Sequence, residues 1–184
     1  MKIISGKYKG KILKGFDING TRPTMDRVKE SLFAMIQDYI KESVVLDLYS
    51  GTGNLAIEAL SNGAKYAYLV DNNKVAIDTI NKNIRSLNIN DAQIIKGDAK
   101  HTLLDFINKK TKFDIIFLDP PYKTNELDKI LLIINNNLNI LNKDALIICE
   151  TDEKIDYTKY NNLFIYKEKC YGSKTVTILK KCIK

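Results

Sequence analysis

The sequence contains one histidine, three cysteines and no tryptophan among its 184 residues. Because His101 stands alone, a histidine-rich metal centre and an acid–base scheme with two imidazoles are both excluded. Cys149, Cys170 and Cys182 are odd in number and lack CxxC spacing, which argues against a disulfide framework and against a zinc site. We therefore expect reduced thiols and assign no metal-binding residue.

Long apolar runs are also missing. No stretch approaches the roughly 20 apolar residues of a membrane-spanning helix, and the opening residues MKIISG lack the apolar run of a signal peptide. We therefore expect a cytoplasmic protein with no membrane partner. A monomer is a separate expectation, which the sequence itself does not decide. A hydrophobic content of 45% is sufficient for one domain with a sizeable core.

Positive charge is concentrated near the start of the chain. Residues 1–30 hold eight lysine and arginine residues against three acidic ones, which places +5 of the net charge of +7 there. A basic flank of this kind suits a polyanionic partner such as RNA, since phosphate contacts supply much of nucleic-acid affinity. A lysine-rich, solvated edge strand would have the same composition, so the charge alone does not decide between them.

Strand and helix patterns alternate from Val44 onward, and they predict an α/β fold with a doubly wound, Rossmann-like sheet. The apolar strand segments are 44–48, 66–70, 93–96, 113–118 and 146–149. Helical spacing covers 54–61, 74–87, 102–108 and 126–136. Two further segments, 163–170 and 175–179, flank the turn YGSK and predict an antiparallel hairpin that closes a mostly parallel sheet.

The segment before Val44 predicts a small extension. Residues 2–13 alternate around two glycines, which indicates a basic β-hairpin or pair of strands. Val28, Leu32 and Met35 recur at helical spacing, and Thr24 or Asp26 can cap the start of that helix. We therefore expect a basic extension over residues 1–41 and a main domain over residues 42–184.

The predicted strand 113–118 runs directly into Asp119-Pro120-Pro121-Tyr122. The prolines end the strand and restrict the residue before each of them, so the Asp119 carboxylate and the neighbouring carbonyls are held rigidly. A carboxylate, a carbonyl and an aromatic ring at one place suit a planar base with an exocyclic amine: the acceptors take the amino hydrogens and the ring stacks. A strand-ending turn with a half-buried tyrosine is the alternative for this tetrapeptide alone.

The first strand-to-helix turn has the pattern of a nucleotide-binding loop. Gly51, Gly53 and Ala56 satisfy G-x-G-x-x-A, and Asp71 ends the second strand, where a ribose-binding acid would lie. Both NAD and S-adenosylmethionine need such glycines and such an acid. This half of the chain therefore leaves the two cofactors open.

Charge separates the two cofactors. Strands one to four end in Asp47, Asp71, Asp98 and Asp119, so four carboxylates should line the carboxyl edge of the sheet, where ligands bind in such folds. A pyrophosphate needs donors, whereas S-adenosylmethionine carries a sulfonium and an ammonium. The acids therefore favour S-adenosylmethionine, with Asp47 near its ammonium and Asp98 near the adenine amine.

Taken together, these motifs resemble the class I S-adenosylmethionine-dependent amino-methyltransferases. The stretches ISGKYKGK (residues 4–11) and TRPTMDRVKESLF (residues 21–33), with the later Tyr171-Gly172, resemble the narrower RsmD-type group of bacterial enzymes, which methylate a guanine N2 in 16S ribosomal RNA. The likeness spans nearly the whole chain, and the second stretch is its most specific part. Ser173-Lys174 departs from the acidic or small polar residue that this family favours, which leaves the role of that hairpin open.

The resemblance implies three groups of site residues. The cofactor, S-adenosylmethionine, is held by Asp47, Tyr49, Ser50, Gly51, Gly53, Asp71, Asn72, Asp98 and Ala99. The target amine and base are held by Asp119, Pro120, Pro121 and Tyr122. RNA faces Lys7, Lys9, Lys11, Arg22, Arg27 and Tyr171, while Lys29 faces RNA or the cofactor carboxylate, or simply solvates its helix.

The implied activity is methylation of a guanine N2 in 16S ribosomal RNA, with the small ribosomal subunit as partner. The nearest alternatives are adenine N6 in DNA or RNA and a protein glutamine, because the Asp-Pro-Pro-Tyr motif serves all of these amines. Little chain remains for a separate DNA-recognition domain. An NAD-dependent oxidoreductase and a noncatalytic RNA-binding protein are the alternatives from other classes.

Overall fold

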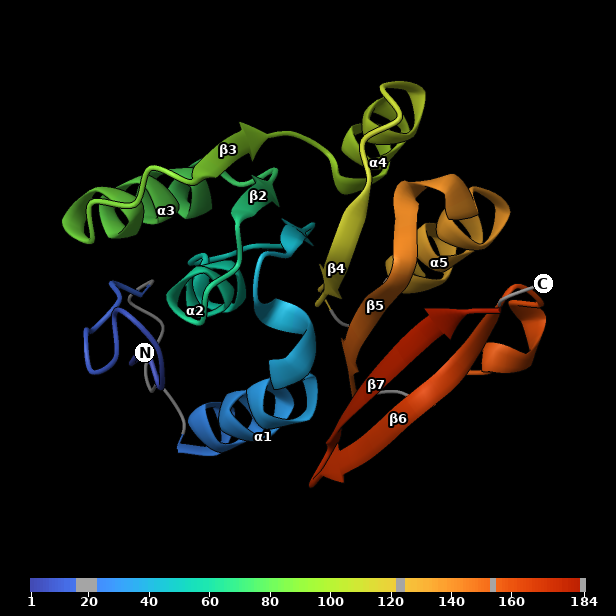
Figure 1. Ribbon diagram of the computed structural model, residues 1–184, viewed down its shortest axis with the longest axis horizontal. Helices are drawn as coiled ribbons and strands as arrows, with labels where there is room; N and C mark the ends of the chain where they lie inside the picture. Colours follow the sequence, from blue (N-terminus) through green and yellow to red (C-terminus); the bar gives the residue numbers. More distant parts are fainter. Residues whose placement is uncertain (16–22, 122–124, 153–154, 183–184) are drawn as a thin grey trace.

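The computed structural model of the chain (Figure 1) describes residues 1–15, 23–121, 125–152 and 155–182, with side chains from residue 26 in the second range. Seven strands form one sheet in the order β3-β2-β1-β4-β5-β7-β6. The first five pair in parallel, and β7 and β6 are antiparallel additions at one side. The strands are β1 (Val44–Asp47), β2 (Tyr66–Asp71), β3 (Ala92–Lys96), β4 (Phe113–Leu118), β5 (Leu141–Thr151), β6 (Leu163–Tyr171) and β7 (Lys174–Lys181).

Helices cover both faces of this sheet, as the alternating pattern predicts. The helices are α1 (Pro23–Ile40), α2 (Asn54–Ser61), α3 (Lys74–Ser86), α4 (Ala99–Asn108) and α5 (Glu126–Asn136), with 3₁₀ turns η1 (Leu138–Ile140) and η2 (Tyr157–Lys159). One apolar core lies between the sheet and α1, α2 and α3, and the other lies between the sheet and α4 and α5. Strand β4 serves both, because Phe117 lies in the first core and Leu118 in the second. The predicted Rossmann-like α/β sheet with a C-terminal antiparallel hairpin is confirmed.

Two element boundaries differ from those expected. Helix α4 begins at Ala99 and not near residue 102, because the Asp98 carboxylate accepts from the His101 backbone N–H at 2.9 Å and caps the helix. Strand β5 begins at Leu141 and not at residue 146. The residues that follow Leu141 in this strand, Asn142-Lys143-Asp144, are polar and mostly exposed. This part of β5 therefore has no apolar pattern in the sequence, although it extends the sheet.

The N-terminal segment is less regular than the expected hairpin. Within residues 1–15 a single antiparallel bridge joins Lys2 to Ile12, and Gly6 and Gly10 have positive φ angles of 78° and 84°. The Ile3 N–H donates to the Lys11 carbonyl at 2.9 Å and the Leu13 N–H donates to the Met1 carbonyl at 2.8 Å, so residues 1–13 pair as a short hairpin, here named the N-terminal loop. The left-handed glycines limit the length of this pairing. Ile3 and Leu13 are buried and anchor the loop in the core shared with α1.

Helix α1 lies between the N-terminal loop and the β6–β7 hairpin (Figure 1). Its apolar residues Val28, Leu32 and Phe33 belong to the same core as the sheet residue Phe117, and the Phe33 and Phe117 rings stack with centroids 6.1 Å apart. The expected division into an extension (residues 1–41) and a main domain (residues 42–184) stays a prediction. Residues of both segments contribute to the same apolar core.

Replacing Gly6 by alanine is expected to detach the N-terminal loop. A Cβ atom at Gly6 would lie 1.8 Å from the Ser61 carbonyl oxygen, whereas at Gly10 the nearest atom, Cε of Lys2, is 3.9 Å away. Both substitutions carry the cost of about 1–2 kcal/mol for an L-residue in the left-handed region, so Gly10→Ala is the matched control. We expect clearly faster proteolysis of residues 1–15 and a lower urea midpoint for Gly6→Ala than for Gly10→Ala. Equal values for the two variants would contradict this contact.

Candidate functional site

The carboxyl ends of the parallel strands bring the four predicted aspartates to one edge. Asp47 is the last residue of β1 and Asp71 the last of β2, and Asp119 directly follows β4. Asp98 follows β3 as the cap of α4. Because β2, β1 and β4 are direct neighbours in the sheet, these acids form a row along the edge where Rossmann-like folds bind ligands.

The turn after β1 is tightly held. The Ser50 hydroxyl donates to the Asp47 carbonyl at 2.8 Å, and the Ser50 N–H donates to the Val70 carbonyl at 2.9 Å. Gly53 has a φ of 80°, and a Cβ there would lie 3.0 Å from a methyl group of Leu69. The turn is thereby pressed against β2, which places its backbone N–H groups at the carboxyl edge of the sheet.

Asp71 ties this turn to the next loop. Its carboxylate accepts the Gly51 N–H and the Asn73 N–H, each at 2.8 Å. Asn72 is exposed between them, and the Asn73 side chain caps α3 by accepting from the Val75 N–H at 2.8 Å. A carboxylate has about four acceptor sites, so Asp71 keeps capacity for ribose hydroxyls.

Asp47 and Asp119 form the most unusual electrostatic environment of the edge. Asp47 is buried, and its carboxylate accepts the backbone N–H groups of Ala56 and Tyr49. Burial first, and the nearby charges of Asp119 and Asp71 next, raise the pKa of Asp47 to about 7. Burial, followed by the charge of Glu150, likewise raises the pKa of Asp119 to about 7, with Lys174 opposing the shift. A cationic ligand would reduce the electrostatic repulsion among these carboxylates and favour their ionised forms.

Sequence reasoning missed Glu150 and Lys174. They lie near the end of β5 and at the start of β7, where they form an ion pair beside Asp119. The strand order could have indicated these two residues. Strand β5 lies next to β4, so the carboxyl end of β5 and the hairpin that follows it flank Asp119. Lys174 is also the second residue of Ser173-Lys174, where the sequence departs from the family that it resembles.

The remaining predicted residues of this edge belong to the motif after β4 and to the turn after β3. Pro120 is buried and Pro121 exposed after the half-buried Asp119, whereas Tyr122 lies outside the described residues. Asp98 is half-exposed and Ala99 is buried as the first residue of α4.

Tyr49 is fastened to the start of helix α5. Its hydroxyl donates to the Glu126 carboxylate at 3.2 Å. Burial, followed by the charge of Glu126, raises the pKa of Tyr49 above its usual range, so this hydroxyl stays a donor. Glu126 is another contact that the sequence did not reveal.

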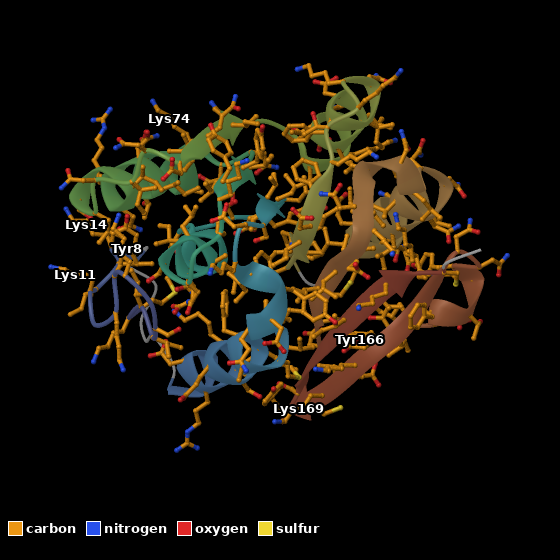
Figure 2. The ribbon with its side chains drawn as sticks, in the orientation of Figure 1. Tyr8, Lys11, Lys14, Lys74, Tyr166 and Lys169 are labelled. Carbon is orange, nitrogen blue, oxygen red and sulfur yellow. The ribbon has the colours of Figure 1, made fainter. Side chains whose placement is uncertain are left out.

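The predicted RNA-facing residues lie in two places. Lys7, Lys9 and Lys11 are exposed on the N-terminal loop, and Arg27 is exposed on α1. Tyr171 lies at the other side of α1, where its hydroxyl donates to the Ser31 hydroxyl at 2.5 Å. Figure 2 shows this separation, with Tyr8, Lys11 and Lys14 at one end of the molecule and Tyr166 and Lys169 on β6. Arg22 lies outside the described residues.

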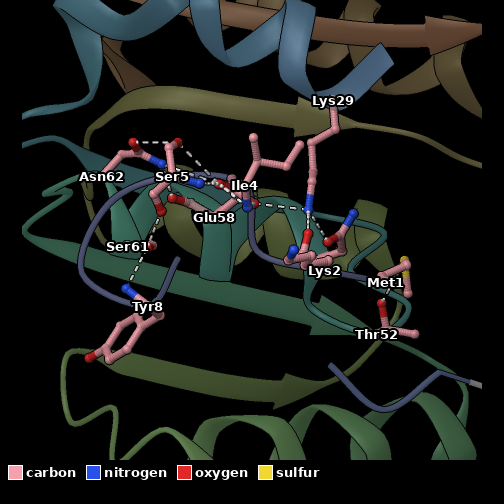
Figure 3. Close-up of polar contacts among 11 residues, drawn as sticks. Met1, Lys2, Ile4, Ser5, Tyr8, Lys29, Thr52, Glu58, Ser61 and Asn62 are labelled. Atoms are coloured by element: carbon pink, nitrogen blue, oxygen red, sulfur yellow. Dashed lines mark hydrogen bonds and ion pairs between the residues drawn. The ribbon is translucent and has the colours of Figure 1, made fainter. Parts of the chain in front are cut away.

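Lys29 is internal, which excludes both the RNA-facing and the solvated role that the sequence suggested. Its side chain is 2% exposed, and Nζ lies 2.8 Å from the Glu58 carboxylate, whose side chain is 0% exposed. The same ammonium donates to the Lys2 carbonyl at 2.7 Å and to the Asn54 side chain at 2.8 Å (Figure 3). The Glu58 carboxylate also accepts from the Ile4 and Ser5 backbone N–H groups. This buried pair therefore joins α1, the N-terminal loop and the first residue of α2.

The doubly wound sheet, the glycine turn after β1 and the acid-lined edge are those of a class I S-adenosylmethionine-dependent methyltransferase, the class to which the family of this chain belongs, and S-adenosylmethionine is its cofactor. The NAD interpretation is thereby wrong. Residues 1–180 match the family model described as "Conserved hypothetical protein 95", and the chain belongs to this family, the RsmD/YlbH family.

Three similar proteins illustrate the match. The chain is 39% identical over 183 residues to "Putative rRNA methyltransferase YlbH" of Bacillus subtilis, covering 98% of this chain and 99% of the relative. It is 34% identical over 177 residues to "Ribosomal RNA small subunit methyltransferase D" of Haemophilus influenzae, covering 94% and 89%. The solved structure "Putative methyltransferase yhhF from Escherichia coli" has a TM-score of 0.82 at 27% identity, covering 98% and 97%. Among the helices that the structure describes, none has the length and apolar character needed to cross a membrane.

Proposed function

We propose that this protein methylates the exocyclic N2 amine of a guanine in 16S ribosomal RNA, within the small ribosomal subunit. The observation that carries the proposal is Asp119: a half-buried carboxylate, restrained by Pro120 and Pro121, at the same edge as the cofactor turn. The names of relatives 31–39% identical to the chain support ribosomal RNA as the substrate. The likeness to RsmD-type enzymes supports the guanine amine.

The cofactor side of the site is proposed as follows. Asp47 accepts from the methionine ammonium directly or through water, Asp71 accepts from the ribose hydroxyls, and Asp98 accepts from the adenine amine. The frame around them consists of Tyr49, Ser50, Gly51, Gly53, Asn72 and Ala99. When bound, the cofactor supplies a methyl group on a positively charged sulfur, which is a good leaving group.

The substrate side is built by Asp119 and the residues after it. Asp119 and the Pro120 carbonyl accept the two hydrogens of the guanine amine, Pro121 restrains the loop, and Tyr122 stacks on the base. These hydrogen bonds favour a more pyramidal nitrogen, whose lone pair is directed at the methyl carbon. The bound cofactor would supply its methyl carbon to this nitrogen and leave as a neutral thioether, and Asp119 or water would accept the amine proton that is released.

Cofactor affinity is expected to rise with pH because of Asp47. Its pKa of about 7 in the folded protein exceeds the usual carboxyl value of 3.8. The folded protein therefore loses stability from this group as pH rises from about 4 to about 7. A cationic cofactor favours the ionised form, so binding releases a proton near neutral pH.

Isothermal titration calorimetry checks this expectation. Between about pH 6 and about pH 8, S-adenosylmethionine affinity should rise about tenfold, following the ionised fraction of one group. The observed heat should also depend on the ionisation enthalpy of the buffer. An Asp47→Asn variant should bind more weakly and lose the pH dependence. A flat profile in the unsubstituted protein would contradict the role of Asp47.

Labelled-methyl transfer tests the proposed substrate. The protein is incubated with S-adenosylmethionine and undermethylated small ribosomal subunits, naked ribosomal RNA, duplex DNA or a glutamine-bearing protein fraction. We expect label in ribosomal RNA. Transfer to DNA or to protein would retain the methyltransferase chemistry and replace the substrate.

A further inference from the structure

The outer edge of the sheet carries exposed aromatic residues. Strand β6 is the last strand of the sheet and pairs with β7 alone. Three consecutive residues on it are partly exposed: Phe164 at 45%, Ile165 at 45% and Tyr166 at 38%. Figure 2 shows Tyr166 and Lys169 on this strand, at the lower edge of the view and apart from the N-terminal loop at its left.

Lysine ammonium groups lie over the tyrosine rings at this edge. Nζ of Lys180 is 4.3 Å from the Tyr166 ring centroid and 4.6 Å from that of Tyr39, and it donates to the Tyr39 hydroxyl at 3.0 Å. Nζ of Lys167 is 5.2 Å from the Tyr166 ring centroid. The two tyrosines, from α1 and β6, meet edge to face with hydroxyls 3.3 Å apart.

The same arrangement continues along β6 toward the catalytic edge. Nζ of Lys169 is 5.3 Å from the Tyr171 ring centroid, and it donates to the Ser31 hydroxyl at 3.0 Å. Lys167, Lys169 and Tyr171 are paired with alternate residues of β7, including Ile178 and Val176 of the core beneath α1. The three side chains therefore share the face of the sheet on which α1 lies.

This row of side chains begins beside the proposed catalytic site. Tyr171 ends β6 at the hairpin turn, and Lys174 starts β7 next to Glu150 and Asp119. The distance along the strand from Tyr171 to Tyr166 is about 17 Å, at roughly 3.3 Å per residue. On β6 itself, Glu168 points to the other face, where its carboxylate accepts from the Thr177 hydroxyl at 2.9 Å. The charges of the row are thus mainly lysine ammoniums, with Asp38 of α1 nearby. Lys169 is exposed, whereas Lys167 is half-buried and donates to the Met35 carbonyl at 3.1 Å.

We propose that Tyr39, Tyr166, Lys167, Lys169, Tyr171 and Lys180, here named the Tyr–Lys track, bind a single-stranded stretch of RNA next to the methylated nucleotide. The ammonium groups contact phosphates, and the exposed Tyr166 ring stacks on a base, with the half-buried Tyr39 and Tyr171 rings beside it in the row. This inference rests on the proposed function for the identity of the RNA. It also gives the Tyr171-Gly172 hairpin a role: it links the track to the catalytic site.

The charge of the track is tested with a triple variant, Lys167→Gln/Lys169→Gln/Lys180→Gln. Its control, Lys109→Gln/Lys112→Gln/Lys143→Gln, makes the same charge change at exposed positions near the amino ends of β4 and β5. Binding of a short, fluorescein-labelled single-stranded oligoribonucleotide is measured by anisotropy over a range of salt concentrations. Each phosphate contact to a single strand contributes about 0.7 to the magnitude of the slope of log K against log salt concentration. Because the track variant removes three lysines, the magnitude of its slope should fall by about 2, whereas that of the control should fall by less than about 1. Thermal melting and S-adenosylmethionine affinity verify that both variants are folded.

Stacking is tested at Tyr166 with two substitutions. Tyr166→Phe keeps the ring and should bind the oligoribonucleotide within about twofold of the unsubstituted protein, whereas Tyr166→Ala should bind roughly 5- to 100-fold more weakly. An equal loss in both variants would overturn the stacking role, since the ring would then matter only through its hydroxyl.

The outcomes separate the track from the proposed function. Equal salt slopes in the track and control variants overturn the track, even if ribosomal RNA is methylated. A reduced slope in the track variant alone supports the track, even if the methylated nucleoside is not guanine. Loss of binding to whole subunits with unchanged binding to naked RNA would assign the surface to a protein partner and overturn the proposal, and absence of RNA binding by the unsubstituted protein would overturn both.

Discussion

An Asp119→Asn variant is expected to lose methyl transfer by about 10³-fold, while its affinity for S-adenosylmethionine stays nearly unchanged. The substitution keeps the volume of the side chain but removes a charged acceptor from the site where the target amine loses a proton. Removing one such group from a preorganised site costs on the order of 10²–10⁴ in rate. Single-turnover transfer and calorimetric binding measure the two effects separately.

The same variant should be more stable than the unsubstituted protein at about pH 8. Burial and Glu150 raise the pKa of Asp119 from the usual 3.8 to about 7, so the folded state loses stability from this group as pH rises from about 4 to about 7, and the loss is complete above that pH. Removing the charge should raise the unfolding free energy by roughly 1–3 kcal/mol at about pH 8, discounted for its partial exposure. The gain should shrink to roughly a third of this value at about pH 5 and vanish below about pH 4, where the carboxyl is protonated in the unfolded state as well.

Asp144→Asn is a matched control, because Asp144 is exposed near the amino end of β5. It should change neither transfer nor stability. If Asp119→Asn kept most of its transfer activity, the role proposed for the carboxylate would be wrong. If it lost cofactor binding as well, Asp119 would belong to the cofactor site instead.

A Lys29→Met variant is expected to lose about 3–5 kcal/mol of unfolding free energy. The substitution leaves the Glu58 carboxylate fully buried without its counter-ion, and removing one member of a buried ion pair costs about this much. It also removes the hydrogen bonds to the Lys2 carbonyl and to Asn54, so the N-terminal loop and the start of α2 should loosen. Urea unfolding gives the free energy, and limited proteolysis follows the loop.

Two further variants isolate the effect of burial. Lys129→Met removes an ion pair at the surface, in which the Lys129 Nζ lies 3.8 Å from the Glu126 carboxylate. This substitution should lower the unfolding free energy by less than about 1 kcal/mol. The double variant Lys29→Met/Glu58→Gln should be more stable than the sum of its single changes predicts, because no unpaired charge remains. A cost for Lys29→Met as small as that for Lys129→Met would show that Lys29 is not buried against Glu58 in solution.

Local patterns were sufficient to predict most of the fold. Helices α2 and α5 and strand β4 begin and end where apolar spacing and turn residues place them, because these signals lie within each segment. The row of aspartates followed from one topological rule, that parallel strands end at a common edge. The roles given to these aspartates stay predictions.

Contacts between distant segments could not be predicted in the same way. Lys29 lies in a basic stretch, which predicts an exposed side chain. It is buried because it pairs with Glu58 of another helix, and the sequence does not show that contact. The hydrogen bond from Tyr171 to Ser31 joins the end of β6 to α1, which requires knowledge of how the hairpin packs. Glu150 and Lys174 became neighbours of Asp119 only through the pairing of β5 with β4 and β7.

The most direct test of the central claim is mass spectrometry of the nucleoside that receives the methyl group. Undermethylated small ribosomal subunits are treated with the protein and S-adenosylmethionine, and their 16S ribosomal RNA is digested to nucleosides. The account predicts N2-methylguanosine at one position, absent when Asp119→Asn is used. N6-methyladenosine, or label in ribosomal protein with unmodified guanosine, would contradict it.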